Sequence, residues 1–179
     1  MNAELIEELL ATGEPAGLGP EVRAGVRSVR EIQSALQKAG SATRLAANRT
    51  ACLQGLLLLW HDHLDEAHAV VQDLPGPDAA WVHGIMHRRE PDYSNARYWF
   101  HRVGRHEAFE PMAEQAAPLL AAHAALPYRL IRDGSWDPMA FIDAVSAAIR
   151  PGSDPGVARL IVDLQRAETL VLARHLLGC

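Results

Sequence analysis

The chain has 179 residues, of which 49% are hydrophobic and 22% charged, and its formal net charge is −5. This length predicts one domain with a single core. The acidic balance excludes a general nucleic-acid binder, which needs a basic excess to displace counterions from phosphates. No apolar run approaches the roughly 20 residues that cross a membrane, and the N-terminus is acidic and amphipathic, unlike a secretion signal. We therefore expect a cytoplasmic protein without a membrane partner.

Cysteine and lysine are both scarce. Cys52 and Cys179 are the two cysteines, and they do not form a C-x-x-C pair. This count excludes a disulfide framework and a cysteine zinc site. Lys38 is the single lysine. It does not belong to a phosphate-binding G-x-x-x-x-G-K-[ST] motif, which excludes P-loop nucleotide hydrolysis.

The N-terminal part of the chain has the pattern of helices joined by short loops. Apolar residues at helical spacing predict helices over residues 1–12, 20–39, 42–60 and 64–74. Pro20 is expected to open the second helix at its first turn, and Gly40 to end it. The helix over 42–60 is apolar nearly all round toward Trp60, which predicts that it lies at the buried centre of the fold.

The remainder continues the same pattern. Helices are predicted over residues 78–90, 93–103, 107–125, 139–149 and 155–177. Asp78 is expected to cap the first of these, and Asp137 followed by Pro138 is a strong start for the helix over 139–149. Period-2 alternation of β-branched residues is nowhere sustained, so we expect no sheet.

The four central helices have the pattern of two copies of one hairpin. Aligning Gly55 with Gly84 places Ala67 opposite Ala96, Val71 opposite Phe100 and Leu74 opposite Val103. The glycines would let two helices approach closely, and the large apolar residues would fill the seam. This spacing resembles the tetratricopeptide helical hairpin, although the period is 29 where that family has about 34 and its later proline is missing.

The predicted architecture follows from this alignment. We expect one all-α domain over residues 1–179, built as a helical array of six to eight helices. Residues 42–104 would form the central pair of hairpins, and residues 1–40 and 105–179 the flanking helices.

His83 and His87 stand four residues apart on a predicted helix, and Glu90 continues the same face. Neighbours at this spacing lie roughly 5–6 Å apart at Cβ, which suits two imidazoles on one divalent metal ion. The metalloprotease H-E-x-x-H motif is not present, because Gly84 occupies the glutamate position. The turn residues His61, Asp62 and His63 could add ligands. The alternative is that these histidines are core residues bonded to neighbouring side chains.

The densest polar run in the chain follows directly, from His87 to Arg97. One interpretation is a buried network that fixes the packing of two helices, with Arg97 paired to Glu90 or Asp92. The other is an anion pocket in which Arg88, Arg97 and Arg102 hold a carboxylate or a phosphate. The candidate binding residues are Arg88, Tyr93, Asn95, Arg97 and Trp99.

The run H-x-x-x-H-R-R-E-P-D-Y-S-N-A-R-Y-W-F, which starts at His83, is similar to a group of uncharacterised bacterial and fungal proteins. The segments Trp60–His68 and Trp136–Asp143 fit the same group, so the resemblance covers the chain from Ala51 onward. It implies one intact domain and no catalytic roles.

Three functional hypotheses remain open. The leading one is a non-enzymatic binding or scaffold protein without a cofactor, which presents a groove lined by Arg88, Arg97 and Trp99 to a protein, a peptide or a small anionic ligand. The alternative is metal-assisted hydrolysis, with His83 and His87 as ligands of a divalent metal and Glu90 or Asp92 as base. The third is a purely structural motif in a homodimer.

Overall fold

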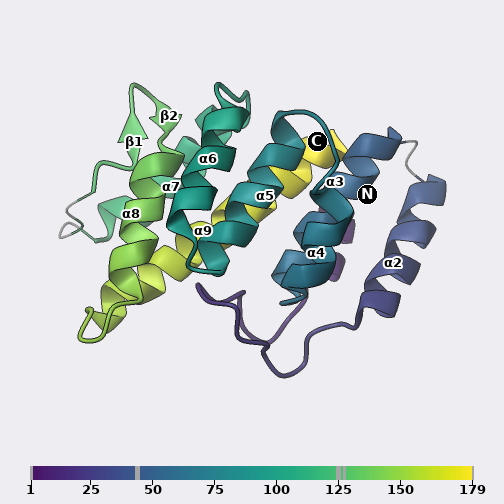
Figure 1. Ribbon diagram of the computed structural model, residues 1–179, viewed down its shortest axis with the longest axis horizontal. Helices are drawn as coiled ribbons and strands as arrows, with labels where there is room; N and C mark the ends of the chain where they lie inside the picture. Colours follow the sequence, from purple (N-terminus) through teal and green to yellow (C-terminus); the bar gives the residue numbers. More distant parts are fainter. Residues whose placement is uncertain (1, 43–44, 124–125, 127, 179) are drawn as a thin grey trace.

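The computed structural model describes residues 2–42, 45–123, 126 and 128–178. Within these ranges the chain forms nine helices and one short two-stranded hairpin, which confirms the all-α prediction (Figure 1). The helices are α1 (Asn2–Leu9), α2 (Val29–Ala42), α3 (Ala47–Trp60), α4 (Leu64–Val71), α5 (Pro77–Arg89), α6 (Tyr93–Val103), α7 (Phe109–Ala121), α8 (Pro138–Ala148) and α9 (Pro155–Leu177). The strands are β1 (Ile131–Arg132) and β2 (Ser135–Trp136).

The longest helix, α9, packs against helices from both ends of the chain. It contacts α1, α3, α7 and α8, and in Figure 1 it runs diagonally across the other helices, from the side of α8 toward α3. Its buried face carries leucines such as Leu160 and Leu172, but also the polar residues Gln165 and Glu168. Because buried polar groups need hydrogen-bond partners, these two side chains determine what packs against α9.

The predicted buried centre of the fold is confirmed at α3. Leu53 and the run Leu56–Leu59 are each at most 2% exposed, and side chains from all nine helices join the same apolar cluster. Among the described residues, every helix is too short or too polar to cross a bilayer.

The hairpins α3–α4 and α5–α6 are built alike at their closest approach. A Cβ atom on Gly55 would lie 2.6 Å from Cγ1 of Val71, and one on Gly84 would lie 2.6 Å from Cε2 of Phe100. No real Cβ makes such a contact, so each hairpin requires a glycine opposite a large apolar residue of its second helix. The aligned glycines therefore do the same job in both hairpins.

Two predicted helix starts are wrong. The helix predicted from Pro20 begins only at Val29, where Ser28 and Glu31 form a capping box: Oε2 of Glu31 accepts hydrogen bonds from the N–H and the hydroxyl of Ser28. The residues before it run without a helix. In addition, α5 begins one residue before Asp78, whose side chain is bonded to distant residues and does not cap the helix.

The segment before α2 does not continue as a helix because its backbone is bonded to side chains from the rest of the fold. Nε2 of Gln165 donates to the carbonyl oxygens of Ala16 and Gly17, at 3.1 and 2.8 Å. The guanidinium of Arg89 donates to the carbonyl oxygen of Gly19, at 2.9 and 3.2 Å. Within the predicted helix itself, the N–H of Arg23 donates to Oδ2 of Asp62 at 2.9 Å, and the N–H of Arg27 donates to Nδ1 of His61 at 3.2 Å. Backbone N–H groups bonded in this way are not available to a helical ladder.

The prediction that the chain forms no sheet is also wrong, in one place. β1 and β2 pair antiparallel, with Ile131 opposite Trp136. Asp133 and Gly134 connect the strands with positive φ angles of 51° and 78°, as the two central residues of a type I′ turn require. Strands of two residues are too short to show a period-2 pattern, so the Asp-Gly pair was the available signal.

Candidate metal centre

Three histidines from two neighbouring helices bring their ring nitrogens together. His83 and His87 lie one turn apart on α5, and His68 reaches them from α4, which packs against α5. One nitrogen of each ring lies within 4.8 Å of the others. The ring centroids are 5.0, 5.5 and 5.8 Å apart. With metal–nitrogen bonds of about 2.0–2.1 Å, rings that share one ion have centroids roughly 5 Å apart, so this three-histidine cluster has the dimensions of a metal site.

His83 is the most deeply buried member of the cluster. It is 1% exposed, and its Nδ1 has no hydrogen-bond partner among the described residues. Burial, together with charge on His68 and His87, lowers the pKa of His83 to about 4. The ring is therefore neutral at physiological pH, which is the form that binds a metal ion. A buried ring nitrogen without a partner is costly, and a metal ion would satisfy it.

His87 is oriented by groups at the end of its own helix and the start of the next. Its Nδ1 lies 2.9 Å from Oε2 of Glu90 and 3.4 Å from Nδ2 of Asn95. A histidine that binds metal through one nitrogen commonly donates its other N–H to a carboxylate, which fixes the tautomer and the ring orientation. Glu90 has this relation to His87, so Glu90 is placed to orient the imidazole of His87.

The second predicted catalytic candidate, Asp92, is occupied as the N-cap of α6. Its Oδ1 accepts hydrogen bonds from the N–H of Asn95 at 3.1 Å and from the hydroxyl of Ser94 at 2.9 Å. These two hydrogen bonds hold the pKa of Asp92 below its usual value. The carboxylate is thus accounted for by helix capping.

The predicted anion-binding arginines each have a different partner. Arg88 is wholly buried and paired with Glu168 of α9. Arg97 is paired with Asp143 of α8, so the predicted pairing of Arg97 with Glu90 or Asp92 is wrong. Arg102 lies over aromatic rings of its own helix. The sequence could not show this, because α8 and α9 come about 45 to 80 residues later.

Of the two remaining predicted binding residues on α6, only Trp99 contacts the cluster. Trp99 is half-buried and stacks directly on His83, with ring centroids 3.9 Å apart and an angle of 1° between the planes. Tyr93 is also half-buried, and burial raises the pKa of its phenol. Trp99 therefore belongs to the wall of the candidate metal centre.

The turn residues His61, Asp62 and His63 do not join the cluster. Nε2 of His61 lies 2.9 Å from the carbonyl oxygen of Leu9, and Nε2 of His63 lies 2.7 Å from the carbonyl oxygen of Arg27. Their rings thus bond to backbone of the N-terminal region. The hypothesis that this turn adds metal ligands is wrong.

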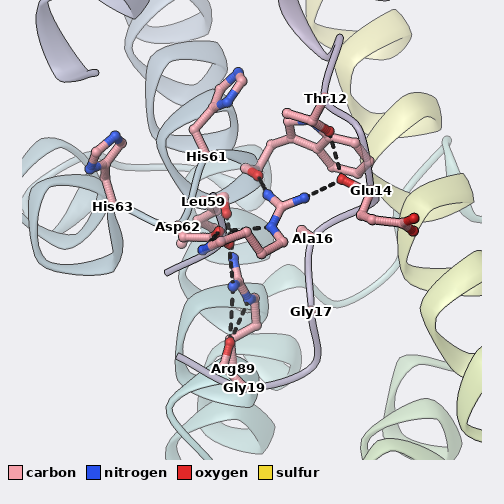
Figure 2. A network of polar contacts seen from close by, with 12 residues as sticks. Thr12, Glu14, Ala16, Gly17, Gly19, Leu59, His61, Asp62, His63 and Arg89 are labelled. Carbon is pink, nitrogen blue, oxygen red and sulfur yellow. Dashed lines mark hydrogen bonds and ion pairs between the residues drawn. The ribbon is translucent and has the colours of Figure 1, made fainter. Parts of the chain in front are cut away.

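Asp62 instead joins two arginines that hold the N-terminal segment against the core. Its carboxylate accepts from Nε of Arg23 at 2.7 Å and from Nη2 of Arg89 at 2.8 Å. Figure 2 shows Arg89 between this turn and the carbonyl oxygen of Gly19. This network is structural, and it explains why Arg89 is buried.

The third member of the cluster, His68, was missed as a site residue. It follows Ala67, which the hairpin alignment pairs with Ala96, and this position was the available signal. Periodicity shows which residues share one helix face, but not which face of another helix meets it.

Comparison of the chain with protein-family models, curated proteins and solved structures finds no match. The tetratricopeptide resemblance and the resemblance to the bacterial and fungal group stay predictions.

Proposed function

We propose that this protein binds a transition-metal ion through His68, His83 and His87 and uses it for metal-assisted hydrolysis. The observation that carries the proposal is the convergence of one imidazole nitrogen each from His68, His83 and His87. Within this cluster His83 is buried, and its Nδ1 has no hydrogen-bond partner among the described residues. Imidazole ligands suit zinc, copper, iron and nickel. Three protein ligands leave a coordination position for water or substrate, as in catalytic zinc sites.

The protein's own groups would have distinct roles in such a centre. Glu90 would accept the Nδ1 proton of His87 and direct Nε2 to the ion. Trp99 would hold the plane of His83 by stacking. A bound ion would supply a nucleophilic hydroxide by lowering the pKa of its water to about 7. His68 is half-buried and the side chain of Glu90 is 33% exposed, which leaves a solvent-facing edge where substrate could enter.

Metal content tests the proposal directly. The protein is purified without a histidine tag, and bound zinc, iron, copper, nickel and manganese are measured together with affinity for added Zn²⁺. We expect about one equivalent at the cluster, lost in His68→Ala, His83→Ala and His87→Ala. His101→Ala is the matched control, because His101 is exposed on α6 and is not a member of the three-histidine cluster. The proposal would be overturned if the wild type bound Zn²⁺ no better than the variant that carries all three substitutions.

A binding or scaffold role remains the second candidate, and a surface on α6 favours it. Tyr98 is 53% exposed, and the guanidinium carbon of Arg102 lies 5.8 Å from the ring centroid of Tyr98 and 5.3 Å from that of Trp99. An exposed aromatic and cationic surface suits an anionic ligand or a peptide. Binding of an acidic peptide that is lost in Tyr98→Ala and Arg102→Ala, with metal content unchanged, would support this role. A concentration-dependent mass in sedimentation would instead support a homodimer.

A further inference from the structure

A second group of metal-ligating side chains lies at the start of α5, at the opposite end of this helix from His87. Asp78 comes from the first turn of α5, His106 from the connection between α6 and α7, and His175 from the last turn of α9. Oδ1 of Asp78 lies 2.9 Å from Nε2 of each histidine. The two imidazole centroids are 4.8 Å apart, at an angle of 71°. Three distant parts of the chain thus bring one carboxylate and two imidazoles to one point.

The group has a further charged neighbour, Glu107, and borders two cavities. Oε1 of Glu107 lies 3.3 Å from Nδ1 of His175. His106 and Glu107 line a cavity of about 730 Å³, and Glu107 and His175 line another of about 350 Å³. A small molecule or a hydrated ion could therefore reach the group from solvent.

We propose that Asp78, His106 and His175 form a second metal site, of the two-histidine, one-carboxylate type, for a divalent transition-metal ion such as Fe²⁺, Mn²⁺ or Zn²⁺. This ligand set leaves coordination positions open for water or an exogenous ligand. Metal–ligand bonds of about 2.0–2.2 Å place neighbouring ligand atoms a little over 3 Å apart. The observed separations of 2.9 Å need to open by only a few tenths of an ångström.

The charges around the group fit a cation. Asp78 supplies a carboxylate, which is anionic at physiological pH. Glu107 is placed to accept the Nδ1 proton of His175, as outer carboxylates do for metal-bound histidines. It would thereby direct Nε2 of His175 to the ion.

The competing explanation is that these side chains form a hydrogen-bond network without a metal ion. In that state each Nε2–H donates to Asp78, and Nδ1 of His106 accepts from the N–H of Ala108 at 3.1 Å. Metal binding would have to displace the Nε2 protons. Nδ1 of His106 would then carry the ring proton and could no longer accept from the N–H of Ala108. The two states therefore exclude each other, and they respond oppositely to loss of the charge on Asp78. Asn at position 78 can still accept an imidazole N–H, but it is a far weaker metal ligand.

The test uses Co²⁺ as the probe, in protein that lacks the three-histidine cluster through His83→Ala. Binding is followed by visible absorption and by quenching of Trp81, whose ring centroid lies 4.8 Å from that of His106. We expect one Co²⁺ per chain, and affinity at least tenfold lower after Asp78→Asn or His175→Gln. Unchanged Co²⁺ affinity after Asp78→Asn, or no Co²⁺ binding at all, overturns the second site.

A second measurement covers the case in which His83→Ala does not fold. The wild-type stoichiometry for Co²⁺ is then compared with that of Asp78→Asn alone. If the wild type binds two Co²⁺ ions and Asp78→Asn binds one, both sites are supported. If the wild type binds one ion and Asp78→Asn binds none, the second site is supported and the three-histidine centre is not. A stoichiometry that Asp78→Asn leaves unchanged overturns the second site whatever the state of the first.

Discussion

Trp99 lies face to face on His83, with ring centroids 3.9 Å apart and planes that differ by 1°. His83 is buried, and its Nδ1 has no hydrogen-bond partner in the part of the chain that the structure describes. No described hydrogen bond at that nitrogen therefore sets the rotation of its ring. The stacked indole therefore restricts the plane in which the imidazole lies. In a metal centre, this plane decides where the ring nitrogens point.

We predict that Trp99→Ala weakens metal binding at the three-histidine cluster although Trp99 itself is not a ligand. Loss of an outer-shell group that orients a ligand typically costs about 10- to 100-fold in affinity, and we expect a loss in this range. Competition with a chelator for Zn²⁺ measures it. Trp99→Phe should lose less, because a phenyl ring can still stack. Tyr98→Ala is the control, and an equal loss there would show that the effect is not due to stacking on His83.

The contact between Gly84 and Phe100 leads to a prediction about stability. In an exposed helix, Gly→Ala stabilises by roughly 0.5–1 kcal/mol. At Gly84 the added methyl would meet the Phe100 ring at 2.6 Å, and overpacking costs about 1–3 kcal/mol. We therefore expect Gly84→Ala to lower the free energy of unfolding, measured in urea. In protein that carries Phe100→Leu, Gly84→Ala should lower the free energy of unfolding by less. An equal loss with Phe100 and with Leu at position 100 would refute this contact as the cause.

A third prediction concerns the buried ion pair between α5 and α9. Both Arg88 and Glu168 are 0% exposed, and Glu168 also accepts from Nε1 of Trp81 at 3.0 Å. Glu168→Gln keeps an acceptor for Trp81 but leaves a buried guanidinium uncompensated, which costs about 3–5 kcal/mol. The double variant Arg88→Met/Glu168→Gln buries no charge and should cost less than the sum of the two single variants. Strict additivity in urea unfolding would contradict this coupling.

The helices could be predicted best where the sequence signal lies within a few residues of the feature that it determines. Asp137 caps α8 by accepting from two backbone N–H groups, as its place before Pro138 indicates. Gly55 and Gly84 occupy the equivalent positions that the hairpin alignment gives them. In each case the helix is determined by its own caps and by contact with the next helix along the chain.

The features that escaped prediction depend on contacts between distant parts of the chain. Arg89 bonds to Gly19 across 70 residues, and the N–H of Arg23 bonds to Asp62 across 39 residues. The second contact occupies an N–H that a helix from Pro20 would need. His68 joins the cluster only because α4 packs against α5. The two histidines four apart, in contrast, could be predicted, because helix geometry alone places them together.

The last prediction concerns acid stability and rests on Asp62. Burial would raise the pKa of its carboxyl, but hydrogen bonds from Arg23 and Arg89 outweigh this effect, and the pKa lies below its usual value. A carboxyl with a lower pKa in the folded than in the unfolded state stabilises the fold above its unfolded pKa, which is about 3.9. This stabilisation is lost as the pH falls through the folded pKa.

We therefore expect Asp62→Asn to lower the free energy of unfolding by about 3 kcal/mol at pH 7, as breaking a buried ion pair does. The difference from wild type should shrink as the pH falls below about 4 and through the lowered pKa of the folded Asp62 carboxyl, because protonation removes the same charge in the wild type. Asn suits the position, where φ is 65°. Asp143→Asn, which breaks an exposed pair with Arg97, should change stability by less than about 1 kcal/mol. Urea unfolding across this pH range measures both variants, and a difference for Asp62→Asn that stays constant would show that its charge does not stabilise the fold.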